Sequence, residues 1–418
     1  MAKKQNQSNI VNSLNKLHVP QPTARPDEFN DFSNLNIPNV EQAECPAIDT
    51  NPHEMRGLAY GLIRVLDDDG NAAGNWNSTI EPHVLVKGLK DMLVTRMFDE
   101  RMQMMHRVGK ISFYMKSTGE EAISVAHAAA INFADMVFPS YRNQGILIAR
   151  GYSLVDMMCQ CLSNARDNCK GRQLPIMYSW KKGNFFSISG NLATQFSQAV
   201  GWAMAEAQQG GGRVASAFVG EGSTAELDFH SALTFATAFS PPVILNITNN
   251  QWAISSNQVV AGGEKTTFAA RGIGFGLPSL RVDGNDFLAV YAATKWAAAR
   301  ARAGLGATVI EYFTYRVAPH SSSDDPSAYR PKNEPDFWPL GDPIDRLKTH
   351  LINLNQWSET QHETLIEDIK TEMKQNYKQA ESYGTLKSGD RPDVTTMFED
   401  VYEDMPLNLL RQRQEMGL

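Results

Sequence analysis

A short turn, Gly220-Glu221-Gly222, stands between an apolar run and a helical pattern, and Asn250 comes at the end of the next apolar run. Glycines let backbone amides approach a phosphate closely, and the positive end of the following helix faces the same anion. The Glu221 carboxylate and the Asn250 amide oxygen, together with phosphate oxygens, are the hard ligands that Mg²⁺ prefers. The spacing therefore predicts a site for a phosphorylated ligand and its magnesium ion.

The same glycines allow two other interpretations. Taken alone, Gly220 and Gly222 are explained more simply by a tight strand-to-helix turn. Gly220, Gly222 and Ala225 also fit the dinucleotide fingerprint G-x-G-x-x-A, which would indicate a nicotinamide oxidoreductase. That fingerprint needs an acidic residue at the end of the next strand, where this chain has Thr248-Asn249-Asn250. The dinucleotide interpretation is therefore the weaker alternative.

Tyr141 and Arg142 follow a predicted strand, where a hydroxyl and a guanidinium fork could bind phosphate oxygens. His320 opens a loop rich in Ser and Asp, soon after a strand that ends in Tyr315-Arg316. Taken alone, a Tyr-Arg pair is more often a surface pair, and a loop histidine is usually a solvated side chain. Two further segments have equally simple explanations: 189–195 as a capping loop, and Phe113-Tyr114-Met115 as core packing.

Apolar periodicity predicts the elements that must position these residues. Strands are expected at 136–138, 185–188, 214–219, 243–247, 280–282 and 308–315, and helices at 85–108, 121–131, 154–162, 192–209 and 225–238, with an Ala- and Arg-rich helix between the last two strands. Thr118 and Glu121 form a predicted capping box, and Asp342-Pro343 is expected to open a helical tail. This alternation predicts an α/β fold of three layers, a parallel sheet with helices on both faces.

The composition is that of a globular protein, and it excludes several classes. The 418 residues are 42% hydrophobic with a net charge of −7, and no long basic run could follow a nucleic acid backbone. No apolar stretch is long enough to span a bilayer. The four cysteines, Cys45, Cys159, Cys161 and Cys169, have no metal-ligand spacing and are expected to be reduced thiols.

Three regions follow from these patterns: an extended arm at 1–60, the α/β domain at 61–330, and a helical region at 331–418. The arm is polar, rich in Asn and punctuated by Pro, so we expect it to wrap a surface or stay mobile. Its beginning lacks the apolar core of a secretory signal, and its early lysines leave a weak organellar presequence open. The expected location is the cytoplasm of a bacterium, with the mitochondrial matrix as the weaker alternative.

A set of motifs then identifies a family that the chain resembles. In order along the chain they are SFYMKSTGEE, KGRQLPIMYS, ISGNLATQFSQAVG, GEGSTAELDFHSA, NNQWAIS, RVDGND, HSSSDDPSAYR and MFEDVYEDMP. Together they resemble the alpha subunits of the thiamine diphosphate-dependent first component of branched-chain 2-oxoacid dehydrogenase complexes. The resemblance extends from about Leu62 to the C-terminus, and the arm before Pro52 matches less well.

The resemblance implies a role for each candidate residue. Magnesium would be held by Glu221, Asn250 and the backbone carbonyl of Trp252, with Glu221 standing where the wider family has Asp. The cofactor would be bound by Tyr141, Arg142, Ser189, Leu192, Gly220, Gly222, Ser223 and His320, of which Ser189 and Leu192 would meet the aminopyrimidine. A potassium ion would be held near Ser189, Thr194 and Gln195. Phe113 would line the substrate pocket, and Arg316, Asp324 and Asp325 would order the loop that bears the catalytic His320. Some relatives carry Arg in place of Thr248.

The implied activity is the oxidative decarboxylation of branched 2-oxoacids such as 2-oxoisovalerate, with transfer of the acyl group to the lipoyl group of an acyltransferase component. The chain holds a single diphosphate unit, so the remaining catalytic groups are expected from a beta subunit in an alpha-two beta-two heterotetramer. A pyruvate or acetoin dehydrogenase alpha subunit is the nearest alternative. A non-catalytic regulatory or structural subunit is an alternative from another class.

Overall fold

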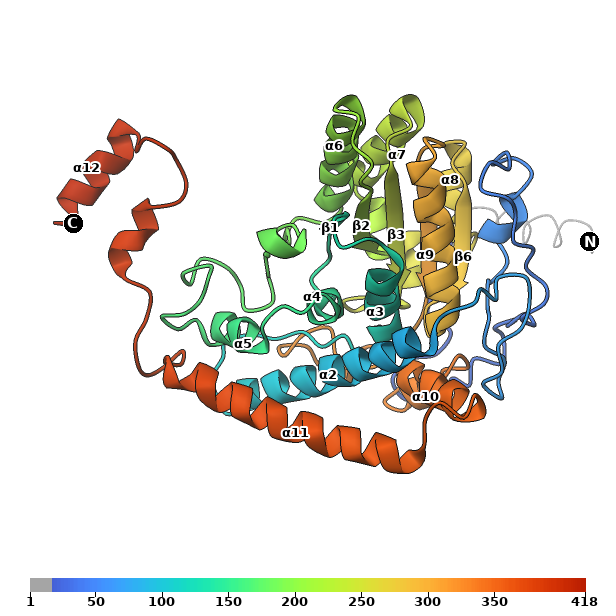
Figure 1. Cartoon of the computed structure of the whole chain (residues 1–418), viewed down its shortest axis with the longest axis horizontal. Helices are drawn as coiled ribbons and strands as arrows, with labels where there is room; N and C mark the ends of the chain where they lie inside the picture. Colours follow the sequence, from blue (N-terminus) through green and yellow to red (C-terminus); the bar gives the residue numbers. More distant parts are fainter. Residues whose placement is uncertain (1–16) are drawn as a thin grey trace, which may run out of the picture.

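Five parallel strands in the order β1-β2-β3-β7-β6 form the central sheet of the structure, a computed structural model that describes residues 17–418 (Figure 1). The strands are β1 (Met136–Phe138), β2 (Ala215–Gly220), β3 (Val243–Asn249), β7 (Thr308–Phe313) and β6 (Ser279–Asp283). Nearly all of their residues are buried, as in a parallel sheet covered on both faces. The predicted α/β class is confirmed.

Helices cover the two faces of this sheet. α6 (Thr194–Gln208) and α7 (Leu227–Phe239) pack together on one face. Phe196, Ala199, Val200 and Ala203 recur at helical spacing along α6 and are all buried there. α3 (Glu121–Ala130) and α9 (Phe287–Arg302) pack against each other on the opposite face. α8 (Ala270–Gly274) lies beside β6.

Two long helices, α2 (Pro82–Arg107) and α11 (Glu359–Ser382), run side by side across one end of the layers (Figure 1). α4 (Gln144–Ala149) and α10 (Pro343–Asn353) pack against α2, and α5 (Leu154–Leu162) packs against α11. α10 begins as predicted, with Asp342 as the cap and Pro343 in the first turn. α12 (Leu407–Glu415) has no buried residue and lies apart from the body.

The division into three regions stays a prediction. The hydrophobic core shows how the last region contacts the α/β domain. Leu347 of α10 and Ile369 of α11 belong to the same buried cluster as the strand residues Ile244 and Ile310. α10 and α11 therefore share the hydrophobic core of the α/β layers, whereas α12 does not. Within residues 17–418, no helix combines the length and apolar character needed to cross a membrane.

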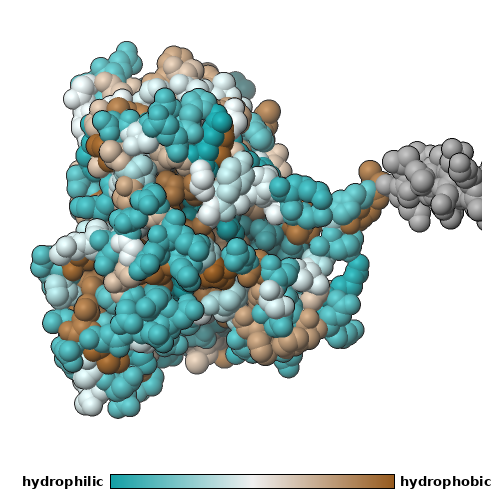
Figure 2. Space-filling view, turned by 90° about the vertical axis from the view of Figure 1, so that its right-hand side faces the viewer, coloured by the Kyte–Doolittle hydropathy of each residue, from teal (hydrophilic) through white to brown (hydrophobic). Residues whose placement is uncertain are grey.

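The arm lies along the surface from residue 17 onward, and its first 16 residues are outside the part described. Between residues 17 and 60, its one helix is the 3-10 turn η1 (Arg56–Ala59). Phe32 packs edge to face on Tyr315 and Trp338, and the Trp296 indole donates to the Pro46 carbonyl at 2.8 Å. Figure 2, which views the side that carries the arm, shows a mostly hydrophilic surface with scattered apolar residues.

Several local predictions were wrong. The strand expected at 185–188 is absent, because Phe185 makes only isolated bridges to Val137 and Trp180. The predicted capping box does not form: Glu120 occupies the cap position, and the Thr118 hydroxyl has no hydrogen-bond partner. Glu121 instead accepts the backbone N–H of Gly119 and pairs with Arg96.

Two helices begin later than predicted, and the tail is broken. α6 begins at Thr194 because Ala193 has a left-handed backbone, with φ of 64°. The Gly-Glu-Gly turn leads first into the 3-10 turn η3 (Gly222–Ala225), and α7 begins only at Leu227. Between α11 and α12 the chain is non-helical except for the 3-10 turn η7 (Val394–Phe398).

Candidate active site

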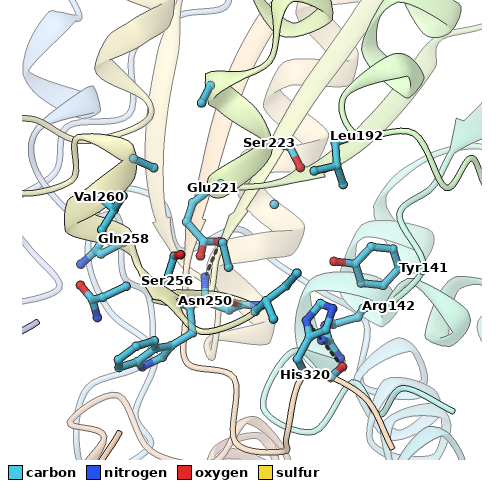
Figure 3. A pocket seen from close by; sticks show the side chains of 18 of the residues that line it. Tyr141, Arg142, Leu192, Glu221, Ser223, Asn250, Ser256, Gln258, Val260 and His320 are labelled. Atoms are coloured by element: carbon cyan, nitrogen blue, oxygen red, sulfur yellow. Dashed lines mark hydrogen bonds between the residues drawn. The ribbon is translucent and has the colours of Figure 1, made fainter. Parts of the chain in front are cut away.

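A cavity of about 460 Å³ opens beside the carboxyl ends of the parallel strands (Figure 3). The register brings these ends together: Gly220 of β2 pairs with Thr248 of β3, and Asn249 of β3 pairs with Phe313 of β7. Ligands of open α/β sheets bind at this edge. The cavity is lined by Tyr141, Arg142, Gly190, Leu192, Gly220, Glu221, Gly222, Ser223, Ala225, Asn250, Trp252, Ala253, Ile254, Ser256, Asn257, Gln258, Val260, Ala261 and His320.

Glu221 places a carboxylate with an unused oxygen in this cavity. The side chain is 1% exposed, its Oε2 accepts the backbone N–H of Asn250 at 3.4 Å, and its Oε1 has no hydrogen-bond partner. Burial, helped by the nearby Glu120 carboxylate, raises the pKa of Glu221 to about 7. A buried oxygen without a partner is costly, and a bound cation would relieve that cost.

Asn250 and Trp252 meet Glu221 from the loop after β3. The Trp252 backbone N–H donates to Asn250 Oδ1 at 3.3 Å, and the Asn250 amide group donates to Glu120 Oε1 at 2.7 Å. The Trp252 carbonyl accepts from Arg316 at 2.6 Å and keeps a second lone pair. The residues predicted to hold magnesium are thus neighbours, and their oxygens suit that ion.

Gly220 and Gly222 differ in how much room they leave for a side chain. A Cβ at Gly222 would lie 2.5 Å from the Ala253 Cβ, so this glycine is needed for the approach of the 252–257 hairpin, formed by β4 (Trp252–Ala253) and β5 (Ser256–Asn257). A Cβ at Gly220 would meet nothing within 4 Å. Both glycines, with the nearly buried Ser223, line the cavity.

Tyr141, Arg142 and His320 meet on one side of the cavity (Figure 3). The Tyr141 and His320 rings meet edge to face, with centroids 6.0 Å apart. Arg142 Nη2 donates to His320 Nδ1 at 3.1 Å and to the His320 carbonyl at 2.7 Å, while Nη1 donates to the Lys116 carbonyl at 2.6 Å. Because a guanidinium can only donate, Nδ1 is the acceptor, and the neutral ring carries its proton on Nε2.

The surroundings keep the His320 ring neutral. Its pKa is lowered to about 3, first by burial and then by the Arg142 and Arg316 guanidiniums. At neutral pH this histidine therefore offers an N–H donor toward a ligand and carries no charge.

Arg316 orders the loop of His320 through a bridging residue that the sequence did not indicate. Its buried guanidinium donates to the Tyr329 hydroxyl at 2.7 Å, and that hydroxyl donates to Asp324 at 2.6 Å. Asp324 also accepts the His320 backbone N–H at 2.7 Å. Asp324 does not pair directly with Arg316, because the Tyr329 hydroxyl stands between their side chains. Asp325 is exposed and caps the 3-10 turn η5 (Pro326–Ala328).

The segment 189–195 borders the inner end of the cavity. Ser189 Oγ accepts from Thr194 Oγ1 at 2.9 Å, and Thr194 Oγ1 also lies 3.1 Å from the Asn191 carbonyl. Gln195 is buried, with no partner for its Oε1. Leu192, 47% exposed, reaches the cavity wall. These residues present several oxygens and one apolar side chain.

Phe113, expected to line the substrate pocket, is not among the residues that line this cavity. It is half-buried and packs against the large apolar cluster. Its neighbour Tyr114 exchanges two hydrogen bonds with Ser322 in the loop of His320, at 3.0 and 2.8 Å. Phe113 therefore lies next to the loop of His320.

Glu120, Tyr329 and the wall from Ala253 to Ala261 were missed by sequence reasoning. In the sequence, Glu120 stands at the expected start of a helix. Nothing nearby indicates its partner Asn250, because the two residues are 130 positions apart. The SAYR segment after His320 held a signal for Tyr329, since a tyrosine hydroxyl can join a buried arginine to a carboxylate.

Two family models match the chain. The sequence model described as "Dehydrogenase E1 component" matches residues 89–388, and "2-oxoisovalerate dehydrogenase E1 alpha subunit N terminal" matches residues 14–53. The arm, which by its motifs resembles the family less well than the rest of the chain, thus matches a family model of its own.

The relatives include the 2-oxoisovalerate dehydrogenase subunit alpha of Pseudomonas aeruginosa, 58% identical over 96% of this chain and 98% of that protein. The mitochondrial subunit of Homo sapiens is 37% identical over 96% of this chain and 91% of that protein. The subunit alpha 2 of Arabidopsis thaliana is 37% identical over 97% of this chain and 84% of that protein. The chain therefore belongs to the dehydrogenase E1 family, and within it to the 2-oxoisovalerate dehydrogenase alpha subunits.

Proposed function

We propose that this chain binds the diphosphate and metal end of thiamine diphosphate and, with a beta subunit, oxidatively decarboxylates branched 2-oxoacids such as 2-oxoisovalerate. Enzymes of this E1 family depend in general on thiamine diphosphate. The observation that carries the proposal is the unpartnered Glu221 Oε1, buried beside Asn250 in a cavity at the strand ends. A divalent cation neutralised by diphosphate oxygens fits that donor set.

The residues of the chain would hold and orient the cofactor. Glu221, the Asn250 side chain and the Trp252 carbonyl would bind Mg²⁺, and Ser223 with the open backbone at Gly220 would meet the diphosphate. The Tyr141 hydroxyl and the Arg142 guanidinium would add donors. When bound, thiamine diphosphate supplies the electron sink into which carbon dioxide is lost from a 2-oxoacid.

His320 would act as a hydrogen-bond donor near the reacting acyl group. Its lowered pKa keeps it neutral, and the contact from Arg142 keeps the proton on Nε2. Arg316, Tyr329 and Asp324 would hold its loop in place, with Asp325 capping the following turn. We expect His320 to serve acyl transfer to the lipoyl group of an acyltransferase component.

Three finer assignments belong to the same proposal. Ser189, Thr194 and Gln195 would hold a potassium ion, supported by the unpartnered Gln195 Oε1 beside two hydroxyls. Ser189 and Leu192 would meet the aminopyrimidine edge. Phe113 would line the substrate pocket beside the loop of His320, which its neighbour Tyr114 contacts.

A beta subunit would supply the carboxylate that activates the pyrimidine, in an alpha-two beta-two assembly. The relatives are named as alpha subunits, and the chain has one diphosphate unit. The higher identity to the Pseudomonas protein than to the mitochondrial ones favours a bacterial, cytoplasmic location.

Reconstitution tests this function. The purified chain, its beta subunit and the two together are assayed for decarboxylation of 2-oxoisovalerate with Mg²⁺ and thiamine diphosphate, using an artificial electron acceptor. We expect turnover only from the mixture, because the site is incomplete in the chain alone. Pyruvate serves as the competing substrate. A higher kcat/KM for pyruvate would point to the pyruvate dehydrogenase alternative, and an inactive mixture that binds no cofactor would favour a non-catalytic subunit.

A further inference from the structure

Glu120 is a buried carboxylate next to the proposed metal site, and none of the roles described above uses it. It is 5% exposed and directly precedes α3. Although it holds the cap position, its side chain makes no capping hydrogen bond. A helix cap therefore does not explain why this carboxylate is buried.

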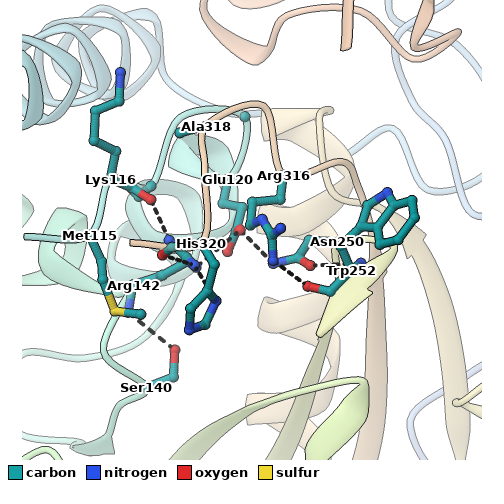
Figure 4. Close-up of polar contacts among 12 residues, drawn as sticks. Met115, Lys116, Glu120, Ser140, Arg142, Asn250, Trp252, Arg316, Ala318 and His320 are labelled. Carbon is teal, nitrogen blue, oxygen red and sulfur yellow. Dashed lines mark hydrogen bonds and ion pairs between the residues drawn. The ribbon is translucent and has the colours of Figure 1, made fainter. Parts of the chain in front are cut away.

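Two contacts account for its carboxylate. Glu120 Oε1 accepts a hydrogen bond from Asn250 Nδ2 at 2.7 Å, and the same oxygen lies 3.8 Å from Arg142 Nε (Figure 4). The first distance is that of a short, charge-assisted hydrogen bond, and the second is an ion pair without one. The dominant partner of Glu120 is thus the amide group of Asn250.

This contact decides which end of the Asn250 amide faces the metal site. The oxygen and nitrogen ends of an asparagine amide have nearly the same shape, so packing alone does not distinguish them. An ionised carboxylate can only accept, so it binds the NH₂ end and repels the oxygen end. Asn250 Oδ1 consequently points away from Glu120, where it also accepts the Trp252 backbone N–H at 3.3 Å.

We propose that Glu120 is a positioning residue that fixes the Asn250 amide with its oxygen turned toward the cation held by Glu221. The proposal rests on the function proposed above, in which Glu221 and Asn250 hold the metal of the cofactor. An asparagine free to rotate would present NH₂ to the cation part of the time. Glu120 removes that second orientation before the metal binds, which is how a neighbouring hydrogen bond orients a metal ligand.

Swapping donor and acceptor tests this role. Asn250→Asp alone places two carboxylates against each other, and we expect Mn²⁺ affinity to fall at least about tenfold, as for like charges in one buried site. Glu120→Gln/Asn250→Asp restores a donor facing an acceptor at unchanged net charge, so the affinity should return to within about threefold of the unmodified protein. Glu120→Gln alone can also present its NH₂ to Asn250 Oδ1, which permits the second orientation, so Mn²⁺ affinity should fall by about threefold or more.

The measurement is Mn²⁺ binding, followed by electron paramagnetic resonance on the reconstituted assembly at saturating thiamine diphosphate. Glu121→Gln is the matched control, because Glu121 is the next buried carboxylate on the same helix but pairs with Arg96. It should lower Tm and leave Mn²⁺ affinity unchanged.

Two results would overturn the positioning role: a double variant that binds Mn²⁺ no better than Asn250→Asp, or a Glu120→Gln variant that binds Mn²⁺ as tightly as the unmodified protein. Glu221→Ala, measured in the same series, separates the two proposals. If Glu221→Ala binds Mn²⁺ normally, the metal site itself is wrong. If Glu221→Ala abolishes binding while the swap fails to rescue it, only the role of Glu120 is wrong.

Discussion

Tyr329→Phe removes a single hydroxyl from the loop that carries His320 and leaves the ring in place. The hydroxyl accepts from Arg316 at 2.7 Å and donates to Asp324 at 2.6 Å. Asp324 in turn accepts the backbone N–H of His320. The substitution therefore cuts the only hydrogen-bonded route between Arg316 and Asp324 within residues 17–418 while changing little else.

The size of the effect follows from these two bonds. Hydrogen bonds to charged groups contribute about 1.5–3 kcal/mol each, and Tyr329 is partly exposed, so we expect the ordered loop to lose about 2–3 kcal/mol in total. Since 1.4 kcal/mol is a factor of ten, the opened loop should become about 30- to 150-fold more populated. Local opening of this kind is what amide exchange reports.

Hydrogen–deuterium exchange of peptides covering 318–330 is the assay, with lipoyl reductive acylation measured on the same preparations. We expect faster exchange in this segment, unchanged exchange in β2 and β3, and acylation reduced at least about tenfold. Tyr291→Phe is the control, because the Tyr291 hydroxyl makes no hydrogen bond to residues 17–418. Exchange and acylation equal to those of the unmodified protein would show that Tyr329 does not order the loop.

Three further predictions concern single positions. His320→Ala should lower the rate of lipoyl acylation far more than it raises KM for the 2-oxoacid, because a group that acts mainly in the transition state affects turnover; rates equal to those of the unmodified protein in both the acylation and the artificial-acceptor assay would show that His320 has no part in the reaction. Gly222→Ala should cost about 1–3 kcal/mol through its contact with Ala253, and Gly222→Ala/Ala253→Gly should recover most of that loss in Tm; no recovery would place the strain elsewhere. The pKa of the buried His127 is lowered from 6.5 to about 3, so its neutral form stabilises the fold above pH 6.5 and this contribution is lost as the pH falls toward 3. At pH 5 the loss is about 2 kcal/mol, and urea unfolding of His127→Gln should show a correspondingly weaker pH dependence; identical pH dependence would refute the assignment.

The sequence predicted the elements best where one local pattern decides the structure. β1 and α5 have the predicted bounds, because an apolar run and a helical apolar stripe end there at polar residues. The strand expected at 185–188 failed because a strand needs a partner, and Phe185 lies next to β1 only at isolated bridges. The capping box at Thr118 does not form because Glu121 pairs with Arg96, which is 25 positions away.

The site was predictable as a set of residues and much less as a set of contacts. Glu221 and Asn250 follow consecutive strands of the sequence, and parallel pairing alone brings them together. The contacts of Glu120 with Asn250 and of Arg142 with His320 join positions 130 and 178 residues apart. No local pattern encodes such contacts, because the packing of loops on the completed sheet creates them.

Calorimetry of thiamine diphosphate binding in the presence of Mg²⁺, for the reconstituted assembly and its Glu221→Ala variant, tests the central claim most directly. Removing this carboxylate takes away Glu221 Oε1, the buried oxygen at the proposed metal position that has no partner among residues 17–418. We expect cofactor affinity to fall at least about a hundredfold, corresponding to about 2.7 kcal/mol, while Tm of the cofactor-free assembly is kept or raised because a buried charge is gone. Cofactor affinity unchanged in the variant would contradict the assignment of Glu221 as the metal ligand and, with it, this account of the site.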